Sequence, residues 1–207
     1  MRPVCGVSEV IAVADADVRL IERCQSHDAA AFNEIVRRYQ SKVYNYVRRM
    51  VGPGPDAEDL AQETFVRAYT NIHSFQSRAS LNTWLFRIAT NLCIDYTRRG
   101  KRRASVASLI VDDEETGQPV DREVPDSRLD PQNVLMNQEL GAVLDRALES
   151  LPEKLRAVVV LHDIEGLPYE EIAGVVDCPL GTVKSRLFNA RAALQNKLAP
   201  YLQGALA

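Results

Sequence analysis

Apolar residues recur at spacings of three and four along nearly the whole chain, and this helical periodicity is interrupted once, between residues 104 and 130. One stripe of this kind runs through Phe32, Ile35, Val36, Tyr39, Val43, Val47 and Met50. Residues at this spacing share one face of a helix, and that face is buried against other helices. The pattern therefore predicts an all-α protein.

The helices of the first half have identifiable ends. Asp28 can cap the helix that carries this stripe, and residues 52–55, a Gly-Pro-Gly-Pro run, end it. Asp56 can cap the next helix, and Ser80 can cap a third. The third helix runs into a strongly basic end at residues 98–103.

Residues 104–130 differ in composition from the rest of the chain. They hold eight acidic residues against two arginines, and two prolines interrupt what periodicity remains. Such a segment is typical of a tether. Helical periodicity resumes at Pro131, a favourable residue for a first helical turn. We therefore expect a frayed extension over residues 1–16 and two small helical domains, at 17–103 and 131–207, joined by a flexible acidic linker.

Composition limits the classes of function. The formal net charge of the 207-residue chain is −3, so nucleic acid can be bound only through local basic patches. The four cysteines are too far apart for a CxxC pair, and the three histidines do not cluster with them, so no metal or cofactor is expected. No apolar run reaches the length of about 18 residues that a membrane span requires. We expect a cytoplasmic protein with reduced thiols and without membrane insertion.

The most specific segment lies near the C-terminus, where helical patterns over 169–176 and 181–198 are separated by a tight turn. With a basic second helix, this arrangement is typical of a helix-turn-helix motif, whose second helix enters the major groove of duplex DNA. The candidates for DNA contact on that helix are Thr182, Lys184, Ser185, Arg186, Phe188, Asn189 and Arg191. The alternative is an ordinary amphipathic helix with a solvated basic face.

A second candidate surface lies on the helix that follows Ser80. Trp84 and Phe86 stand near its start, and a polar face runs along it. Cations beside aromatic and amide groups suit single-stranded DNA, and a flipped base needs a pocket of such groups. The candidates are Asn82, Thr83, Arg87, Asn91, Arg98, Arg99, Lys101, Arg102 and Arg103. Alternatively, both aromatic residues are core and the basic run only complements the helix dipole.

A third feature is a small acidic patch formed by Asp56, Asp59, Gln62 and Glu63, largely off the apolar stripe of their helix. Acids in a first helical turn are favourable by themselves, which explains Asp56 and Asp59. Gln62 and Glu63 lie beyond that turn, so we interpret the patch as a surface for a protein partner. A metal site here is a weak alternative because no histidine is near in sequence.

Together these segments resemble one known family. Residues 56–65 (DAEDLAQETF) resemble the polymerase-binding part of sigma region two, and residues 83–91 (TWLFRIATN) the part that melts and reads the minus-ten element. Residues 151–156 (LPEKLR), 169–173 (YEEIA) and 181–187 (GTVKSRL) resemble sigma region four. By the order and spacing of these motifs, the chain is identified as a member of the extracytoplasmic-function group of the sigma-70 family.

The resemblance implies a transcription initiation factor that performs no bond-making chemistry. Core RNA polymerase would be bound at a coiled coil of its largest subunit, by the acidic patch, and at its flap region. The helix after Ser80 would bind the minus-ten strand, the helix from Gly181 the minus-thirty-five duplex, and the linker would thread toward the polymerase active-site channel. An anti-sigma factor is expected as a further partner, as in other stress-response sigma factors.

Two other classes compete with this interpretation. A stand-alone repressor or activator would bind DNA without polymerase and would have no use for the segment from Trp84 to Asn91. A carboxylate metalloenzyme at the acidic patch lacks a completing histidine or cysteine. The chain also departs from many sigma factors at two positions. Pro168 replaces a serine or threonine cap, and Asn189 replaces an arginine, which leaves the preferred bases open.

Overall fold

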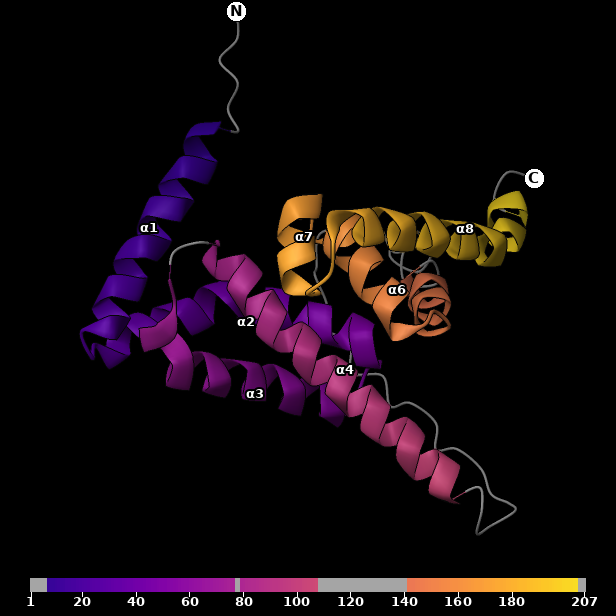
Figure 1. Ribbon diagram of the computed structural model, residues 1–207, viewed down its shortest axis with the longest axis horizontal. Coiled ribbons are helices and arrows are strands. Elements are labelled where there is room, and N and C mark those ends of the chain that lie inside the picture. Colours follow the sequence, from indigo (N-terminus) through magenta and orange to yellow (C-terminus); the bar gives the residue numbers. More distant parts are fainter. Residues whose placement is uncertain (1–6, 77–78, 108–140, 205–207) are drawn as a thin grey trace, which may run out of the picture.

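The computed structural model describes residues 7–76, 79–107 and 141–204, and these form helices joined by turns (Figure 1). The first half contains α1 (Val7–Gln25), α2 (Ala29–Val51), α3 (Pro55–Asn71), the short 3-10 helix η1 (Ile72–Ser74) and α4 (Leu81–Ala107). The second half contains a helix over 141–149, α6 (Glu153–Val159), the π-helical turn η2 (Val160–Ile164), α7 (Tyr169–Val175) and α8 (Leu180–Gly204). The predicted all-α class is confirmed.

Two of the three predicted helix caps are present. An Asp28 carboxylate oxygen accepts hydrogen bonds from the amides of Ala30 and Ala31, at 2.9 and 3.3 Å. The Ser80 hydroxyl accepts one from the Thr83 amide at 3.1 Å. The prediction that Asp56 caps α3 is wrong, because α3 begins at Pro55 and Gly54 occupies the cap position. Proline is favourable in a first turn, and the preceding Gly54 has a φ of +137°, which lets the chain turn sharply into the helix.

The helices extend past two of the expected boundaries. The N-terminal segment expected to be frayed is helical from Val7, because its apolar residues continue the helical spacing of the segment that follows. The basic end of α4 continues as helix through Ala107, since no proline interrupts it there. The rest of the predicted linker and the helix start at Pro131 lie outside the described residues.

The core of the first domain forms between α2, α3 and α4. The predicted stripe on α2 is confirmed, with Ile35, Val43, Val47 and Met50 at most 1% exposed. The Tyr46 hydroxyl lies 2.6 Å from the hydroxyl of Thr90 on α4, which satisfies both buried groups. Phe86 is also fully buried, so it belongs to the core and not to a strand-binding surface.

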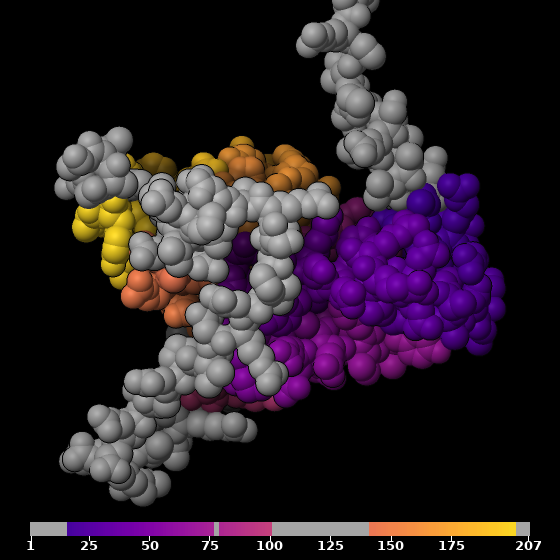
Figure 2. Space-filling view, turned by 180° about the vertical axis from the view of Figure 1, so that it is seen from behind, coloured from indigo at the N-terminus to yellow at the C-terminus, as the bar shows by residue number. Residues whose placement is uncertain are grey.

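The two domains pack against each other. α7 contacts α4, and α6 contacts both α2 and α4, so the orange and yellow helices lie across the purple and magenta ones (Figure 1). From behind, the orange and yellow atoms of the second domain are seen to the left of the indigo and purple atoms of the first (Figure 2). Ion pairs join Arg48 to Asp145 at 3.0 Å and Arg49 to Glu165 at 3.9 Å.

One buried side chain spans this contact. Arg156 on α6 is 8% exposed, and its guanidinium donates to three main-chain carbonyl oxygens. These belong to Met50 at the end of α2 and to Glu149 and Leu151 just before α6. Because the last carbonyls of a helix have no partner within the helix, Arg156 caps α2 from the other domain.

We expect Arg156→Met to lower the free energy of unfolding by about 2 kcal/mol or more, because buried carbonyls lose a charged donor. Urea unfolding followed by circular dichroism measures this. The exposed neighbour Lys154 provides the control, since Lys154→Met removes a charge from the same helix without removing a contact of this kind. Equal effects of the two substitutions would contradict the role assigned to Arg156.

Candidate nucleic-acid and polymerase interfaces

The acidic patch lies on the outer face of α3. The opposite face of the helix, with Ala57, Leu60, Ala61, Thr64 and Ala68, is buried.

Three of the four patch residues carry free or loosely held polar groups. Asp59 and Gln62 are exposed, and neither has a hydrogen-bond partner in the described part of the chain. Glu63 is half-exposed and pairs with Arg67 one turn later, at 2.7 Å. Asp56 is exposed too, but its carboxylate accepts a hydrogen bond of 2.7 Å from the Tyr96 hydroxyl on α4. The sequence did not indicate that Asp56 is tied to the next helix.

Apolar side chains extend this surface along α3. Val66 is 56% exposed and Tyr69 is 54% exposed, and both follow the acidic residues along the helix. Large exposed apolar side chains next to charged ones are typical of protein interfaces. The acidic patch and this pair together form what we call the α3 face.

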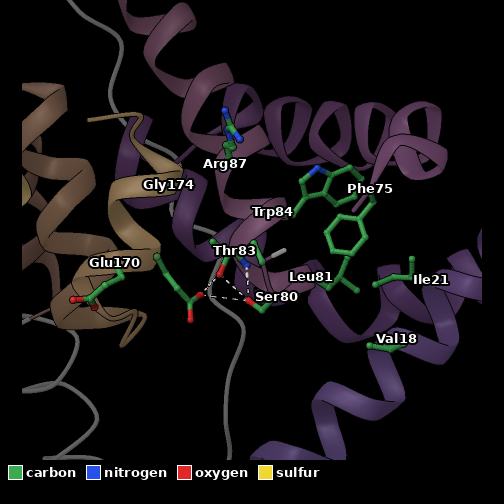
Figure 3. A pocket seen from close by; sticks show the side chains of 12 residues that line it. Val18, Ile21, Phe75, Ser80, Leu81, Thr83, Trp84, Arg87, Glu170 and Gly174 are labelled. Carbon is green, nitrogen blue, oxygen red and sulfur yellow. Dashed lines mark hydrogen bonds between the residues drawn. The ribbon is translucent and has the colours of Figure 1, made fainter. Parts of the chain in front are cut away.

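The start of α4 borders a cavity of about 670 Å³. Its walls come from α1, from the loop before α4, from α4 itself and from α7 (Figure 3). Phe75 and the half-buried Trp84 meet edge to face in it, with ring centroids 5.0 Å apart, and Arg87 also lines it. The cavity falls within the range of volumes of small-ligand pockets, and its lining combines aromatic walls with a cation.

Thr83, a candidate for strand contact, is buried in this structure. Its hydroxyl lies 2.7 Å from that of Ser80, and it donates to the carboxylate of Glu171 on α7. The neighbouring Asn82 is half-buried. Helical periodicity within each domain does not predict the contact between Thr83 and Glu171, because these two residues lie 88 positions apart in the sequence.

The loop before α4 is held by α1. The Gln25 amide donates to the carbonyl oxygens of Ile72 and Phe75, at 3.1 and 3.2 Å. Backbone carbonyls that lie outside regular secondary structure need hydrogen-bond donors from other parts of the protein. Gln25 thus positions Phe75 in the cavity wall. Sequence reasoning missed it because a lone glutamine at a helix end has no distinctive pattern.

The polar face of α4 is open to solvent. Arg87, Asn91 and Arg98 are exposed, as their helical spacing predicts, and Arg99 is exposed too. Arg99 donates to the carbonyl of Asp95 at 3.2 Å. The remaining candidates, Lys101, Arg102 and Arg103, lie on the last turns of α4, where the side chains are outside the described part.

The helix-turn-helix has the expected form. α7 and α8 are separated by a turn in which Asp177 has a φ of +48°. Val183, Leu187, Ala190 and Leu194, at spacings of four, three and four, are at most 9% exposed and form the inward face of α8.

Most candidates on α8 face solvent. Lys184, Ser185 and Asn189 are exposed, and Phe188 is 74% exposed, which is unusual for an aromatic residue without a partner. Thr182 and Arg186 are half-buried. Arg186 reaches back to the turn, where its guanidinium lies 3.5 Å from the Cys178 sulfur.

Arg191 is not free, in contrast to the expectation. Its guanidinium forms a two-pronged ion pair with Asp163 in η2, and one of the two contacts measures 3.0 Å. A carboxylate matches the fork of an arginine side chain, so this pair fixes α8 against the turn that precedes α7. The sequence did not indicate it because Asp163 lies 28 positions away.

Within the described residues, no three metal-ligating side chains come together. Nor is any described helix both long and apolar enough to cross a bilayer.

Comparisons with known proteins agree with this geometry. Residues 35–103 match the family model for sigma-70 region 2, and residues 142–194 match that for sigma-70 region 4. The chain is 41% identical to the ECF RNA polymerase sigma-E factor of Escherichia coli K12, over 90% of this chain and 96% of that protein. It is 38% identical to the factor of the same name from Haemophilus influenzae, over 90% of this chain and 97% of that one.

Solved structures show the same fold. CnrH in complex with the cytosolic domain of CnrY has a TM-score of 0.65 at 26% identity, over 90% of this chain and 99% of that one. The sigma factor RpoE of Bartonella quintana, in complex with the anti-sigma factor NepR, has a TM-score of 0.61 at 24% identity. That match covers 81% of this chain and 96% of the other.

The chain thus has two helical domains, one with a helix-turn-helix and one with an acidic, partly apolar face. These domains correspond to the two regions of a sigma factor that the family models describe. The chain belongs to the extracytoplasmic-function group of the sigma-70 family, the sigma factors of RNA polymerase that direct promoter-specific transcription initiation.

The three described cysteines differ in burial, which predicts their reactivity. Burial raises the pKa of the Cys93 thiol to about 12 and also raises that of Cys24, so little thiolate, the reactive form, is present near neutral pH. Cys178 is half-exposed. We expect maleimide to label Cys178 faster than Cys24 and Cys93 in the folded protein, with mass spectrometry as the readout and urea-unfolded protein as the control. Rapid labelling of Cys93 in the folded chain would contradict this.

Proposed function

We propose that the three surfaces divide the work of promoter recognition. The α3 face binds core RNA polymerase, the cavity and polar face of α4 bind the melted minus-ten strand, and α8 reads the minus-thirty-five duplex. The observation that carries the proposal is that surfaces of three different chemistries lie on three separate elements. The α3 face is acidic and partly apolar, the cavity at α4 is aromatic and lies beside a row of cations, and α8 is basic. Each of these surfaces fits a different partner.

The cavity beside Thr83 fits a base that has left the stack. Phe75 and Trp84 offer aromatic surface, and Arg87 and Asn91 offer donors along the same helix for the strand that leads to it. Duplex DNA has no unpaired base to place there. This favours a role for α4 after melting and a role for α8 before it.

The segment between the two domains acts as a tether in this proposal. Residues 17–103 form the polymerase-binding and strand-binding domain, and residues 131–207 form the duplex-binding domain. Because each domain offers a limited contact area, joining them raises the effective concentration of one once the other is bound. The acidic part would run toward the polymerase active-site channel.

The same α3 face suits a second, competing partner. A factor that covers Asp59, Glu63 and Tyr69 would exclude polymerase, as expected of an anti-sigma factor. The relative from Bartonella quintana was solved with such a factor. In a competition assay, we expect an anti-sigma factor of this chain to displace core polymerase. Simultaneous binding of both would mean that the anti-sigma factor binds elsewhere.

The double substitution Asp59→Ala/Glu63→Ala tests polymerase binding. Since neither side chain is buried, the variant should keep its helical circular dichroism spectrum yet lose core polymerase in pull-down and promoter-specific transcripts in a reconstituted reaction. Glu58→Ala is the control, because Glu58 is an exposed acid of the same helix outside the patch. Undiminished transcription by the double variant would remove the patch from the mechanism.

Substitutions on α8 and on α4 are expected to impair different steps, duplex binding and promoter opening. Lys184→Ala should weaken binding to duplex with the upstream element. If Lys184 neutralises a phosphate, the magnitude of the slope of log affinity against log salt should fall by about 0.9. If Lys184 contacts a base, the binding free energy should weaken by about 1–3 kcal/mol. Asn91→Ala should leave duplex binding unchanged and reduce promoter opening.

Duplex titrations at several salt concentrations, together with permanganate footprinting of the polymerase complex, separate these effects. An Asn91 variant that opens promoters normally but binds duplex poorly would mean that the helices were assigned the wrong way round.

A further inference from the structure

We propose that Arg67 of α3 is a further phosphate-binding residue for the minus-ten strand, and that Glu63 holds its guanidinium until polymerase binds. This inference rests on the proposed function, since it adds a contact to the strand that α4 is proposed to bind. Arg67 was not among the candidates for DNA contact, because it lies on α3 and not on the polar face of α4.

Arg67 shares a second cavity, of about 390 Å³, with two candidate cations of α4, and the lining residues are Arg67, Asp95, Arg98 and Arg99. The three lining residues on α4 are spaced three and four positions apart, so they share one face of that helix, and α3 packs beside it (Figure 1). Long helical side chains lean toward the N-terminus of their helix, and Arg67 does so in reaching Glu63. Arg99 does the same in reaching the carbonyl of Asp95. Cations of two helices thus converge on one cavity.

This second cavity has an excess of positive charge and unused donors. Its lining has three guanidinium groups against the single carboxylate of Asp95. Arg67 and Arg99 each use only the Nε atom for bonds within the described structure, and Arg98 forms none to any described residue. The terminal nitrogens of all three are therefore available, and the planar fork that they form matches the oxygens of a phosphate. Because like charges repel, an anion between them lowers the electrostatic energy.

The position of the second cavity indicates a phosphate of the DNA backbone. Arg87, Asn91 and Arg98 are exposed on α4, and Arg87 also lines the aromatic cavity at the start of that helix. At roughly 1.5 Å per residue, Arg87 and Arg98 lie about 16 Å apart along the helix axis. A strand that places a base in the aromatic cavity and continues along α4 therefore brings the phosphate of another nucleotide to the second cavity. There it meets Arg67 from the side of α3.

The ion pair of Arg67 with Glu63 can be exchanged for other partners at little cost. The two charged groups are 2.7 Å apart, but both side chains are nearly half exposed, and ion pairs in contact with solvent contribute little to stability. Glu63 belongs to the acidic patch, so polymerase that binds Glu63 leaves the guanidinium of Arg67 free for a phosphate. Through this one ion pair, polymerase binding favours strand binding, and linkage requires the reverse as well.

The test uses holoenzyme assembled from core polymerase and the full chain, with the labelled non-template strand of an active promoter. Fluorescence anisotropy at several salt concentrations gives the slope of log affinity against log salt. Arg67→Ala should lower the magnitude of that slope by about 0.7, the value for one phosphate contact to a single strand, and Arg67→Lys should keep most of it. Core polymerase should bind the Arg67→Ala chain at least as well as the wild type, because Glu63 is then free for polymerase.

Arg37→Ala is the matched control. Arg37 is an exposed arginine of α2 that does not line the second cavity, and its loss changes the net charge by the same amount. The inference is refuted if Arg67→Ala leaves the slope unchanged or if the two variants lower it equally. Loss of core polymerase by Arg67→Ala would also refute it, because Arg67 would then belong to the polymerase interface.

Strands with one neutral methylphosphonate in place of a phosphate locate the contact. At one position this change should weaken binding by the wild type and add nothing to the effect of Arg67→Ala, because the same contact is already lost. Additive effects at every position would mean that Arg67 attracts the strand without contacting it, which overturns the inference. Arg98→Ala and Asn91→Ala keep the two ideas apart. If neither weakens strand binding, the proposed function of α4 fails, whereas a failure of Arg67→Ala alone refutes only the role of Arg67.

Discussion

The arrangement of the two domains depends on one buried guanidinium. Arg156 is removed from water, which lowers its pKa, and the carboxylates of Glu149 and Glu153 partly offset this cost. Its hydrogen bonds go to carbonyl oxygens at the end of α2 and at the entry to α6. A buried charge persists only when it is surrounded by acceptors, so the α2 terminus and the turn before α6 must stay together for Arg156 to remain buried. Both domains are therefore oriented through this residue.

The same helices serve as core and as functional surface. On α4, Leu85, Phe86 and Ala89 are fully buried, whereas Arg87 and Asn91 on the other side of the helix face solvent. The spacing that fixes the inner face also fixes the outer one, because both follow from 3.6 residues per turn. A substitution on the outer face therefore changes binding with little effect on packing.

Helical periodicity was sufficient to predict most of the elements, the inward face of α8 and the exposure of most candidate residues, but it did not predict that α1 begins at Val7. It identified the cap at Asp28 because a cap is a local interaction between residues two or three positions apart. It failed at Asp56, where the backbone of Gly54 and Pro55 decides the start of the helix. It also failed at Thr83 and Arg191, whose partners Glu171 and Asp163 come from distant segments. Contacts between elements depend on how the helices pack, and no periodicity specifies that.

The contacts missed in this way are polar, and the one between Thr83 and Glu171 joins the two domains. Apolar contacts between domains lose free energy steadily with the area exposed, whereas a hydrogen bond such as that of Thr83 with Glu171 can be replaced by a bond to water. The net contribution of one such bond is therefore small. Besides the contacts of Arg156, the polar contacts between the domains include Arg48–Asp145, Arg49–Glu165 and Thr83–Glu171. Because hydrogen bonds and ion pairs require a defined geometry, these contacts select one orientation of the two domains, which buried apolar area alone would not do.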